Sequence, residues 1–193
     1  GNPYTGNYNK YGDGFDLDWA VDEDSTYIPQ ELIEEFGGRI YIIPPYQHLF
    51  SYMKTLIKLF KTNKYSIVHS HINSLSIFPL CAAQIAKVKI RIAHSHSSSG
   101  NNEFKRNIIK YILRPFSKVF PNCFFACSNF AGRWLFGKKF MESGKVIILN
   151  NAIDTSKFSY NKEIRKSIRK KENLEGKFVV GHVGRFVNQK NHE

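Results

Sequence analysis

The triplet His-Ser-His occurs twice in the sequence, at residues 69–71 and again at 94–96. Each triplet closes a short run of apolar and β-branched residues, and such runs bounded by polar residues are typical of buried strands. The segment between them, residues 75–88, is rich in apolar residues and alanine and is long enough for a helix. A strand, a helix and a second strand form a βαβ unit, whose parallel strands end at the same edge of a sheet. The sequence therefore predicts that the two triplets lie close together, at an edge where open α/β sheets bind ligands.

Strand-like and helix-like segments alternate along most of the chain. Further strands are predicted in residues 15–21, 39–45, 123–128 and 145–154. Helices are predicted in residues 27–38, 49–64, 102–120 and 129–137, with a kink or break near Pro115 and a cap at Ser128. This alternation predicts the α/β class, as a Rossmann-like, doubly wound and mostly parallel sheet.

Changes in composition suggest four regions. Residues 1–14 are rich in Gly, Asn and Tyr and are interpreted as an irregular or added tail, followed by a Rossmann-like domain over residues 15–155. Residues 156–176 are predicted to form a linker and a basic surface helix. Residues 177–193 read as a buried strand with a Gly-rich exit. We expect this strand to open a second Rossmann-like domain, at the start of which the chain ends.

The composition is that of a globular protein with a strong positive charge. Of 193 residues, 42% are hydrophobic and 23% are charged, while the formal net charge is +12. This charge favours an anionic partner, whether nucleic acid, acidic lipid or sugar phosphate. No run of 18 or more apolar residues is present, and no signal peptide is recognised, so we expect neither a membrane span nor export. Three cysteines provide no disulfide framework and suit a reducing cytoplasm.

The segment 104–120 carries a basic stripe beside an apolar face. Apolar residues recur there every four positions, and basic residues recur at the same spacing. The basic residues are Arg106, Lys110, Arg114 and Lys118. Although a solvated helix face is the usual explanation, this pattern also predicts a helix that lies on an anionic membrane surface. Nucleic acid would explain the charge equally well, but no nucleic-acid-binding module is recognisable, and we expect no nucleic acid partner.

Five motifs follow one another along the chain, in residues 65–71, 91–99, 126–137, 146–158 and 183–193. Taken in this order, they resemble the motifs of a GT-B glycosyltransferase, most closely one of family 4 from bacterial capsule and exopolysaccharide clusters. The resemblance covers the first domain and the first strand of the second. It implies a retaining, metal-independent enzyme without a cofactor, which moves a sugar from a nucleotide-sugar donor to a lipid-linked saccharide acceptor. It also implies a cytoplasmic enzyme, peripheral on the inner face of the plasma membrane.

The resemblance also implies roles for individual residues. Arg185 and Lys190 correspond to the pair that clamps the donor diphosphate, where cations stabilise the charge of the leaving group. His96 corresponds to the histidine that faces the donor sugar, although His94 is its competitor for the cleft. The remaining candidates for the cleft or the acceptor site are His71, Ser97 and Ser98.

Other functions also fit parts of this sequence. Four clustered histidines permit a zinc or non-haem iron hydrolase, but residues 94–101 supply no Asp or Glu, and strand ends explain the histidines. We therefore predict no metal site. A UDP-GlcNAc 2-epimerase of the same fold and a non-enzymatic basic module that binds nucleic acid or membrane are the alternatives.

The sequence departs from the family pattern at its start. Family members begin with a strand and a Gly-rich loop, whereas residues 1–14 contain glycines but no strand pattern. Family members also hold the nucleotide mainly in the second domain, with two glutamates that lie beyond the position of Glu193. We therefore expect this chain by itself to transfer no sugar.

Overall fold

The structure is a computed structural model that describes residues 17–23, 28, 30–35, 37–96 and 104–184. The chain divides after Asn151 into two compact units, which are described separately. The predicted domain limits at residues 155 and 176 stay predictions.

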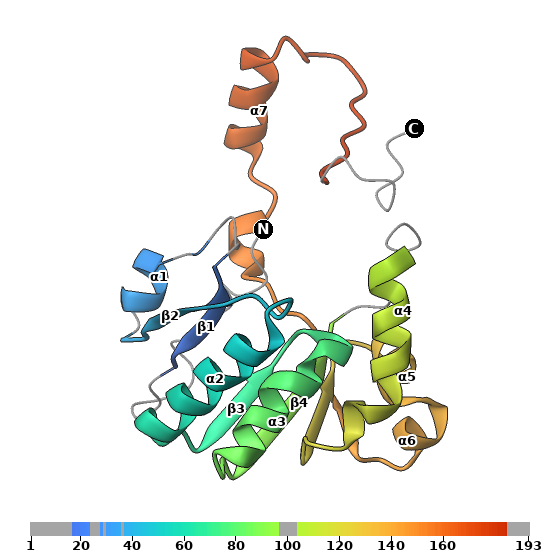
Figure 1. The fold of residues 1–193 in the computed structure, drawn as a ribbon. Coiled ribbons are helices and arrows are strands. Elements are labelled where there is room, and N and C mark those ends of the chain that lie inside the picture. Colours follow the sequence, from blue (N-terminus) through green and yellow to red (C-terminus); the bar gives the residue numbers. More distant parts are fainter. Residues whose placement is uncertain (1–16, 24–27, 29, 36, 97–103, 185–193) are drawn as a thin grey trace. The chain divides into compact units, whose positions relative to one another are not determined.

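The unit that ends at Asn151 alternates strands and helices along the chain (Figure 1). Its strands are β1 (Trp19–Asp22), β2 (Ile40–Ile43), β3 (Ile67–Ser70), β4 (Ile90–Ser95), β5 (Cys123–Ala126) and β6 (Val146–Ile148). Its helices are α1 (Gln30–Glu35), α2 (Leu49–Asn63), α3 (Ile77–Ile85), α4 (Phe104–Leu113), α5 (Asn129–Phe136) and α6 (Lys138–Glu142), with 3₁₀ turns η2 (Asn73–Ser76) and η3 (Arg114–Lys118). The predicted α/β class is confirmed, and α6 is an element that the sequence did not predict.

The strands form two parallel sheets. β1 pairs with β2, and the larger sheet has the order β3-β4-β5-β6. In the larger sheet Ile67 lies opposite Ile90, and Ser70 lies opposite Ala93. The βαβ unit predicted around the two histidine triplets is therefore present, and its strands end together.

The two faces of the larger sheet carry different side chains, because successive residues of a strand point to opposite faces. Val68, Ala93 and Phe124 share one face, where they pack in a cluster with Leu80 of α3 and Phe136 of α5. In Figure 1, α2 and α3 run alongside each other across β3 and β4. The histidines of the triplets lie on the opposite face of the sheet.

The ends of α5 are fixed by side chains. Ser128 caps its start as predicted, since its Oγ accepts a hydrogen bond from the Ala131 amide at 3.2 Å. The last carbonyls of α5 accept hydrogen bonds from η3, the short turn that contains Pro115, where the break was predicted. Arg114 donates to the Arg133 carbonyl at 3.4 Å, Ser117 to the Leu135 carbonyl at 3.2 Å and Lys118 to the Phe136 carbonyl at 3.3 Å. Two cations thus lie at the negative end of the helix dipole.

A buried carboxylate links the small sheet to the end of α2. Asp18 accepts a hydrogen bond from the Arg39 guanidinium at 2.8 Å and another from the Tyr65 hydroxyl. The Asp18 side chain is 5% exposed, so the carboxylate of this ion pair is shielded from solvent. Although partial burial opposes ionisation, these hydrogen bonds lower the pKa of Asp18.

In the second unit the described residues form η4 (Thr155–Phe158) and α7 (Lys162–Lys171), a basic helix as predicted. Asn161 caps α7 by accepting hydrogen bonds from the amides of Glu163 and Ile164. The strand predicted from residue 177 onward is wrong for residues 177–184, which form no strand. Phe178 and Val183 are 94% and 100% exposed, because no described strand pairs with this segment.

Replacing a buried leucine should lower the free energy of unfolding of the first unit more than replacing an exposed residue of the same helix. Leu80 is fully buried between α3 and the sheet, so Leu80→Ala should lower the free energy of unfolding by about 2–5 kcal/mol. Ile85, in the same helix, is 48% exposed, and Ile85→Ala should change it by less than about 0.5 kcal/mol. Urea denaturation followed by circular dichroism measures both. Equal losses for the two variants would contradict the packing described here.

Candidate functional site

The register of β3 and β4 brings both histidine triplets to one edge. His69 lies opposite Ile92, and His94 follows two residues later on the same face. His71 and His96 come directly after the two strands, at their carboxyl ends. The four histidines therefore form one group, which we call the histidine cluster.

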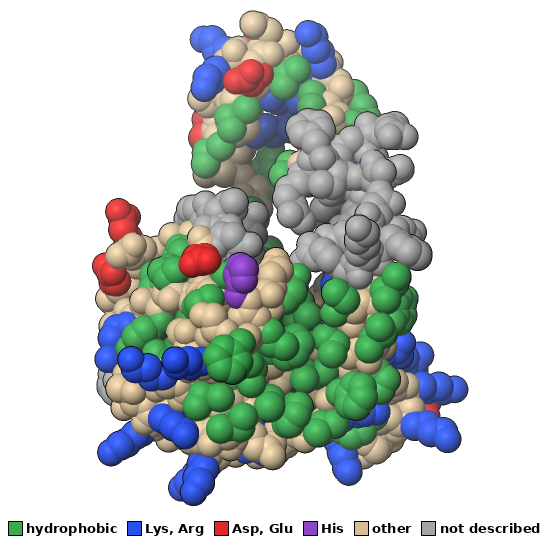
Figure 2. All heavy atoms as spheres, viewed as in Figure 1, with side chains coloured by type: hydrophobic (Ala, Val, Ile, Leu, Met, Phe, Trp, Pro, Cys, Tyr) green, Lys and Arg blue, Asp and Glu red, His purple; other side chains and the backbone are tan. Residues whose placement is uncertain are grey.

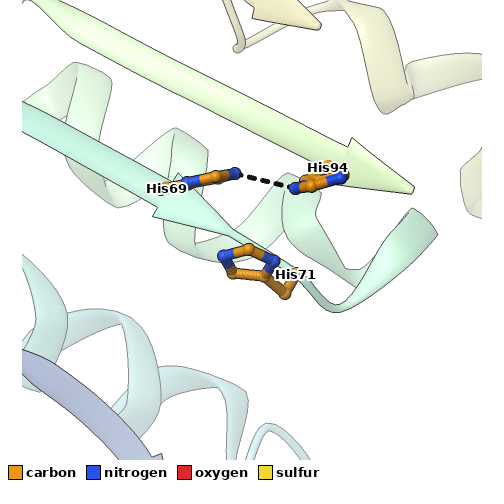
Figure 3. Close-up of side chains that lie close together, drawn as sticks. All are labelled: His69, His71 and His94. Carbon is orange, nitrogen blue, oxygen red and sulfur yellow. Dashed lines mark hydrogen bonds between the residues drawn. The ribbon is translucent and has the colours of Figure 1, made fainter. Parts of the chain in front are cut away.

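The cluster consists of two hydrogen-bonded pairs. His69 Nε2 lies 3.1 Å from His94 Nδ1, as Figure 3 shows. His71 Nδ1 lies 2.7 Å from His96 Nε2. In each pair one ring nitrogen donates and the other accepts, so the tautomers of the two partners are coupled.

The two pairs lie against each other as layers. The ring of His71 is 4.1 Å from that of His69 between centroids, and the ring of His96 is 4.0 Å from that of His94. Phe125, from β5, meets His69 and His94 edge-on at 5.6 and 5.8 Å. His94 is the most enclosed of the four residues, at 4% exposed. Its Nε2 is buried and has no hydrogen-bond partner within the described part of the chain.

The backbone around His96 is held by three neighbours. Asn73 Oδ1 accepts a hydrogen bond from the His96 amide at 3.2 Å, and the Cys127 thiol donates to the His96 carbonyl at 3.3 Å. Ser95, fully buried, donates to the Ala131 carbonyl at 2.9 Å. His96 is thus fixed to η2, to the end of β5 and, through Ser95, to α5.

The environment keeps the histidines neutral. Burial, with smaller effects from neighbouring imidazoles, lowers the pKa of His71 to about 2 and that of His94 to about 3. Burial and His96 lower the pKa of His69 to about 4, although part of this residue reaches the surface. Burial also lowers the pKa of His96, against an opposing hydrogen bond with the Asn151 side chain.

These properties limit the chemistry of the cluster. Neutral imidazoles donate and accept hydrogen bonds and bind metal ions, but they provide no fixed positive charge for a diphosphate. Bases with such low pKa values take a proton from a hydroxyl poorly at neutral pH. The cluster is therefore suited to orienting a polar ligand, and stabilising an anionic leaving group needs cations from elsewhere.

The structure brings together only some of the predicted site residues. His71 and His96 are in contact, and the buried His94 faces the cluster interior rather than solvent. Ser97, Ser98, Arg185 and Lys190 lie outside the described residues. Arg106 belongs to α4, but its side chain is not described.

Sequence reasoning missed two residues that contact His96. Asn73 reaches the His96 amide from a left-handed backbone conformation with φ of 53°, which asparagine tolerates better than most residues. An asparagine two residues after the first triplet was the available signal. Asn151 forms a side-chain hydrogen bond with His96, and its only signal was its place in the Asn-Asn-Ala motif.

The three cysteines are free thiols, as the sequence predicted. Burial raises the pKa of the Cys81 thiol. None of the described helices is long and apolar enough to cross a membrane.

A parallel α/β sheet with polar side chains at its carboxyl edge belongs to the class of folds that bind ligands at that edge. Comparison with known proteins identifies the family. Residues 12–157 match the family model described as Glycosyltransferase Family 4. This match covers most of the chain, and the protein belongs to glycosyltransferase family 4.

A curated relative and solved structures agree with this assignment. The relative is named "Putative glycosyltransferase EpsF" of Bacillus subtilis (strain 168), and it is 30% identical over 168 residues, or 84% of this chain and 44% of the relative. The Anabaena protein Alr3699/HepE in complex with UDP-glucose is similar with a TM-score of 0.68 at 15% identity, over 90% of this chain and 47% of that chain. Its complex with UDP gives a TM-score of 0.64 at 12% identity, over 91% and 55%. The predicted GT-B fold is confirmed, and the chain spans about half the length of these proteins.

The buried neutral histidines should make stability depend on pH. The pKa of His94 is about 3 in the folded chain and near the ordinary histidine value of 6.5 in the unfolded chain, so between these values only the unfolded chain binds the proton. Stability should therefore be independent of this group above pH 6.5 and fall as the pH drops below it, by about 1.4 kcal/mol per pH unit for each proton bound.

Urea denaturation between pH 4.5 and 8, with a chelator present, measures this dependence. His94→Asn should reduce the slope below pH 6.5, whereas His48→Asn, at an exposed position outside the cluster, should leave it unchanged. A slope that is the same in all three proteins would contradict the burial of His94.

Proposed function

We propose that this chain is the acceptor-side half of a retaining, metal-independent glycosyltransferase. The enzyme moves a sugar from a nucleotide-sugar donor to a lipid-linked saccharide acceptor in the synthesis of a surface polysaccharide, at the inner face of the plasma membrane. The observation that carries the proposal is membership of family 4 over residues 12–157, a range that contains the whole histidine cluster. The donor class is supported by the crystallisation of a protein of similar fold with UDP-glucose and with UDP.

The proposal divides the work between neutral and charged groups. His96 orients the donor sugar by hydrogen bonds. Its ring is held by His71, and its backbone amide is held by the side-chain oxygen of Asn73. Arg185 and Lys190 stabilise the negative charge that builds on the departing diphosphate, which neutral imidazoles cannot do. No protein carboxylate of this half serves as a nucleophile.

Removing the cations should slow transfer in the full-length enzyme. Arg185→Ala and Lys190→Ala should each lower kcat by about 100- to 1,000-fold, because each loses charge stabilisation specific to the transition state. Lys171→Ala, which removes an exposed lysine at the end of α7, should leave kcat within about twofold and serves as the control. The assay follows release of nucleoside diphosphate from a panel of UDP-sugars, with a membrane extract as the source of acceptor.

Two further measurements separate the alternatives: analysis of the nucleotide sugar left without acceptor, and RNA binding at varied salt. Epimerised nucleotide sugar formed without acceptor would replace the proposal by a 2-epimerase. Salt-sensitive binding of RNA without sequence preference, together with no sugar turnover, would replace it by a basic binding module.

The surface around α4 supports a membrane contact. Ile108, Ile112 and Phe116 are 44%, 62% and 54% exposed, beside the predicted basic stripe. Figure 2 shows hydrophobic side chains gathered on one face of the molecule, with Lys and Arg around its margin. Within the stripe, Arg114 and Lys118 also donate to carbonyls at the end of α5. The Arg114 guanidinium carbon lies 5.8 Å from the centroid of the Trp134 ring, and Lys118 Nζ lies 5.4 Å from that of Phe140.

Replacing the stripe by glutamine should weaken binding to anionic vesicles. The variant Arg106→Gln/Lys110→Gln/Arg114→Gln/Lys118→Gln should lose at most about 1 kcal/mol of binding free energy per charge at low salt, and less at high salt. Arg114 and Lys118 should contribute least, because their donors contact carbonyls of α5. The matched control changes four cations of α7, namely Lys162, Arg165, Lys166 and Lys170, to glutamine and should bind nearly as the parent does. Vesicle sedimentation measures binding, and circular dichroism confirms that both variants fold. Unchanged binding by the first variant would refute the membrane role of the stripe.

A further inference from the structure

We propose that the histidine cluster is a binding site for a divalent transition-metal ion of the kind that prefers imidazole, with Zn²⁺ as the best match. The ligands are one ring nitrogen each from His69, His71 and His94. The proposal goes beyond the proposed transferase function and does not depend on it.

The geometry of the three rings carries the inference. One potential ligand nitrogen from each of these histidines lies within 4.8 Å of the others. His69 Nε2 and His94 Nδ1 are 3.1 Å apart. Two imidazoles that bind one tetrahedral zinc ion at about 2.05 Å each place their nitrogens about 3.3 Å apart. The first pair is therefore near the required spacing. His71 lies beside both rings in Figure 3, with its candidate nitrogen within 4.8 Å of theirs, and it must move closer to share the ion.

The donor set selects the class of ion. It contains imidazole nitrogens without a carboxylate or a thiolate, a set that suits Zn²⁺, Co²⁺, Ni²⁺ and Cu²⁺ and does not suit Mg²⁺ or Ca²⁺. The lack of a nearby Asp or Glu led the sequence analysis to predict no metal site. Three histidines without a carboxylate are nevertheless a known zinc ligand set, so the spatial arrangement removes that objection.

The surroundings indicate an exchangeable ion rather than a structural one. Histidines that hold structural or catalytic metals usually donate their second ring nitrogen to an acceptor, and losing such a partner typically weakens binding 10- to 100-fold. The second nitrogen of His94, Nε2, is buried without a described partner. We therefore expect reversible binding, weaker than at sites whose ligand histidines donate to such a partner.

An ion at this site would act on the rest of the cluster. His71 Nδ1 is hydrogen-bonded to His96 Nε2 at 2.7 Å, so an ion bound by His71 would be one hydrogen bond away from His96. In this proposal, occupancy fixes the orientation of the His71 ring, which contacts the residue that the transferase proposal places beside the donor sugar.

Cobalt is a suitable probe because its visible spectrum reports the number and type of its ligands. The tag-free chain, stripped of metal with a chelator, is titrated with Co²⁺, and bound Zn²⁺ is then measured by competition. We expect one Co²⁺ per chain, with a tetrahedral spectrum. Thiolate-to-cobalt bands should be absent, which would exclude the three free cysteines as rival ligands. Zn²⁺ should displace the cobalt.

Single substitutions assign the ligands. His69→Gln is the primary variant, because His69 is exposed and its replacement spares the core, and it should weaken Co²⁺ binding at least about 100-fold. His71→Gln should do the same, and His48→Gln, outside the cluster, should bind as the parent does. Circular dichroism checks that each variant folds. Failure of the parent chain to bind Co²⁺ at 100 µM would overturn the proposal, as would equal binding by His69→Gln or a thiolate spectrum. None of these results bears on sugar transfer, which is measured separately.

Discussion

The parallel register of β3 and β4 is the constraint on which the site depends. Because Ile67 lies opposite Ile90, the two His-Ser-His triplets end the strands in step, with all four imidazoles on one face. A slip of one residue in β4 would turn His94 and His96 into the helix-covered core and expose Ala93. The helix face prevents this slip, since Ala93 packs tightly with Leu80 and Phe136. Packing on one side of the sheet thereby fixes the chemistry on the other.

The second feature that determines the chemistry of the histidine cluster is the absence of an acidic partner among its described neighbours. Buried histidines beside a carboxylate would be held as cations, whereas burial next to other imidazoles lowers each pKa. The proposed transfer needs positive charge at the diphosphate, and a neutral edge leaves that task, in the proposal, to Arg185 and Lys190. The neutral lone pairs that suit a sugar hydroxyl also suit a soft cation, so one arrangement supports both proposals.

Much of the fold could be predicted from the sequence because the signals are local. The apolar runs before each triplet, the cap at Ser128 and the break at Pro115 each depend on a few neighbouring residues, and all were confirmed. The pairing of the imidazoles depends on register and rotamers, which no local pattern contains. The role of Asn73 depends on a left-handed backbone beside another strand. Residues 177–184 have a strand pattern, but a strand also requires a neighbour to pair with.

The contacts at the end of α5 bear on how the net charge of +12 should be understood. Arg114 and Lys118 are counted in that total, yet their donors point at helix carbonyls, where partial negative charge already compensates them. The formal charge thus overstates the field that an approaching anion meets over α4.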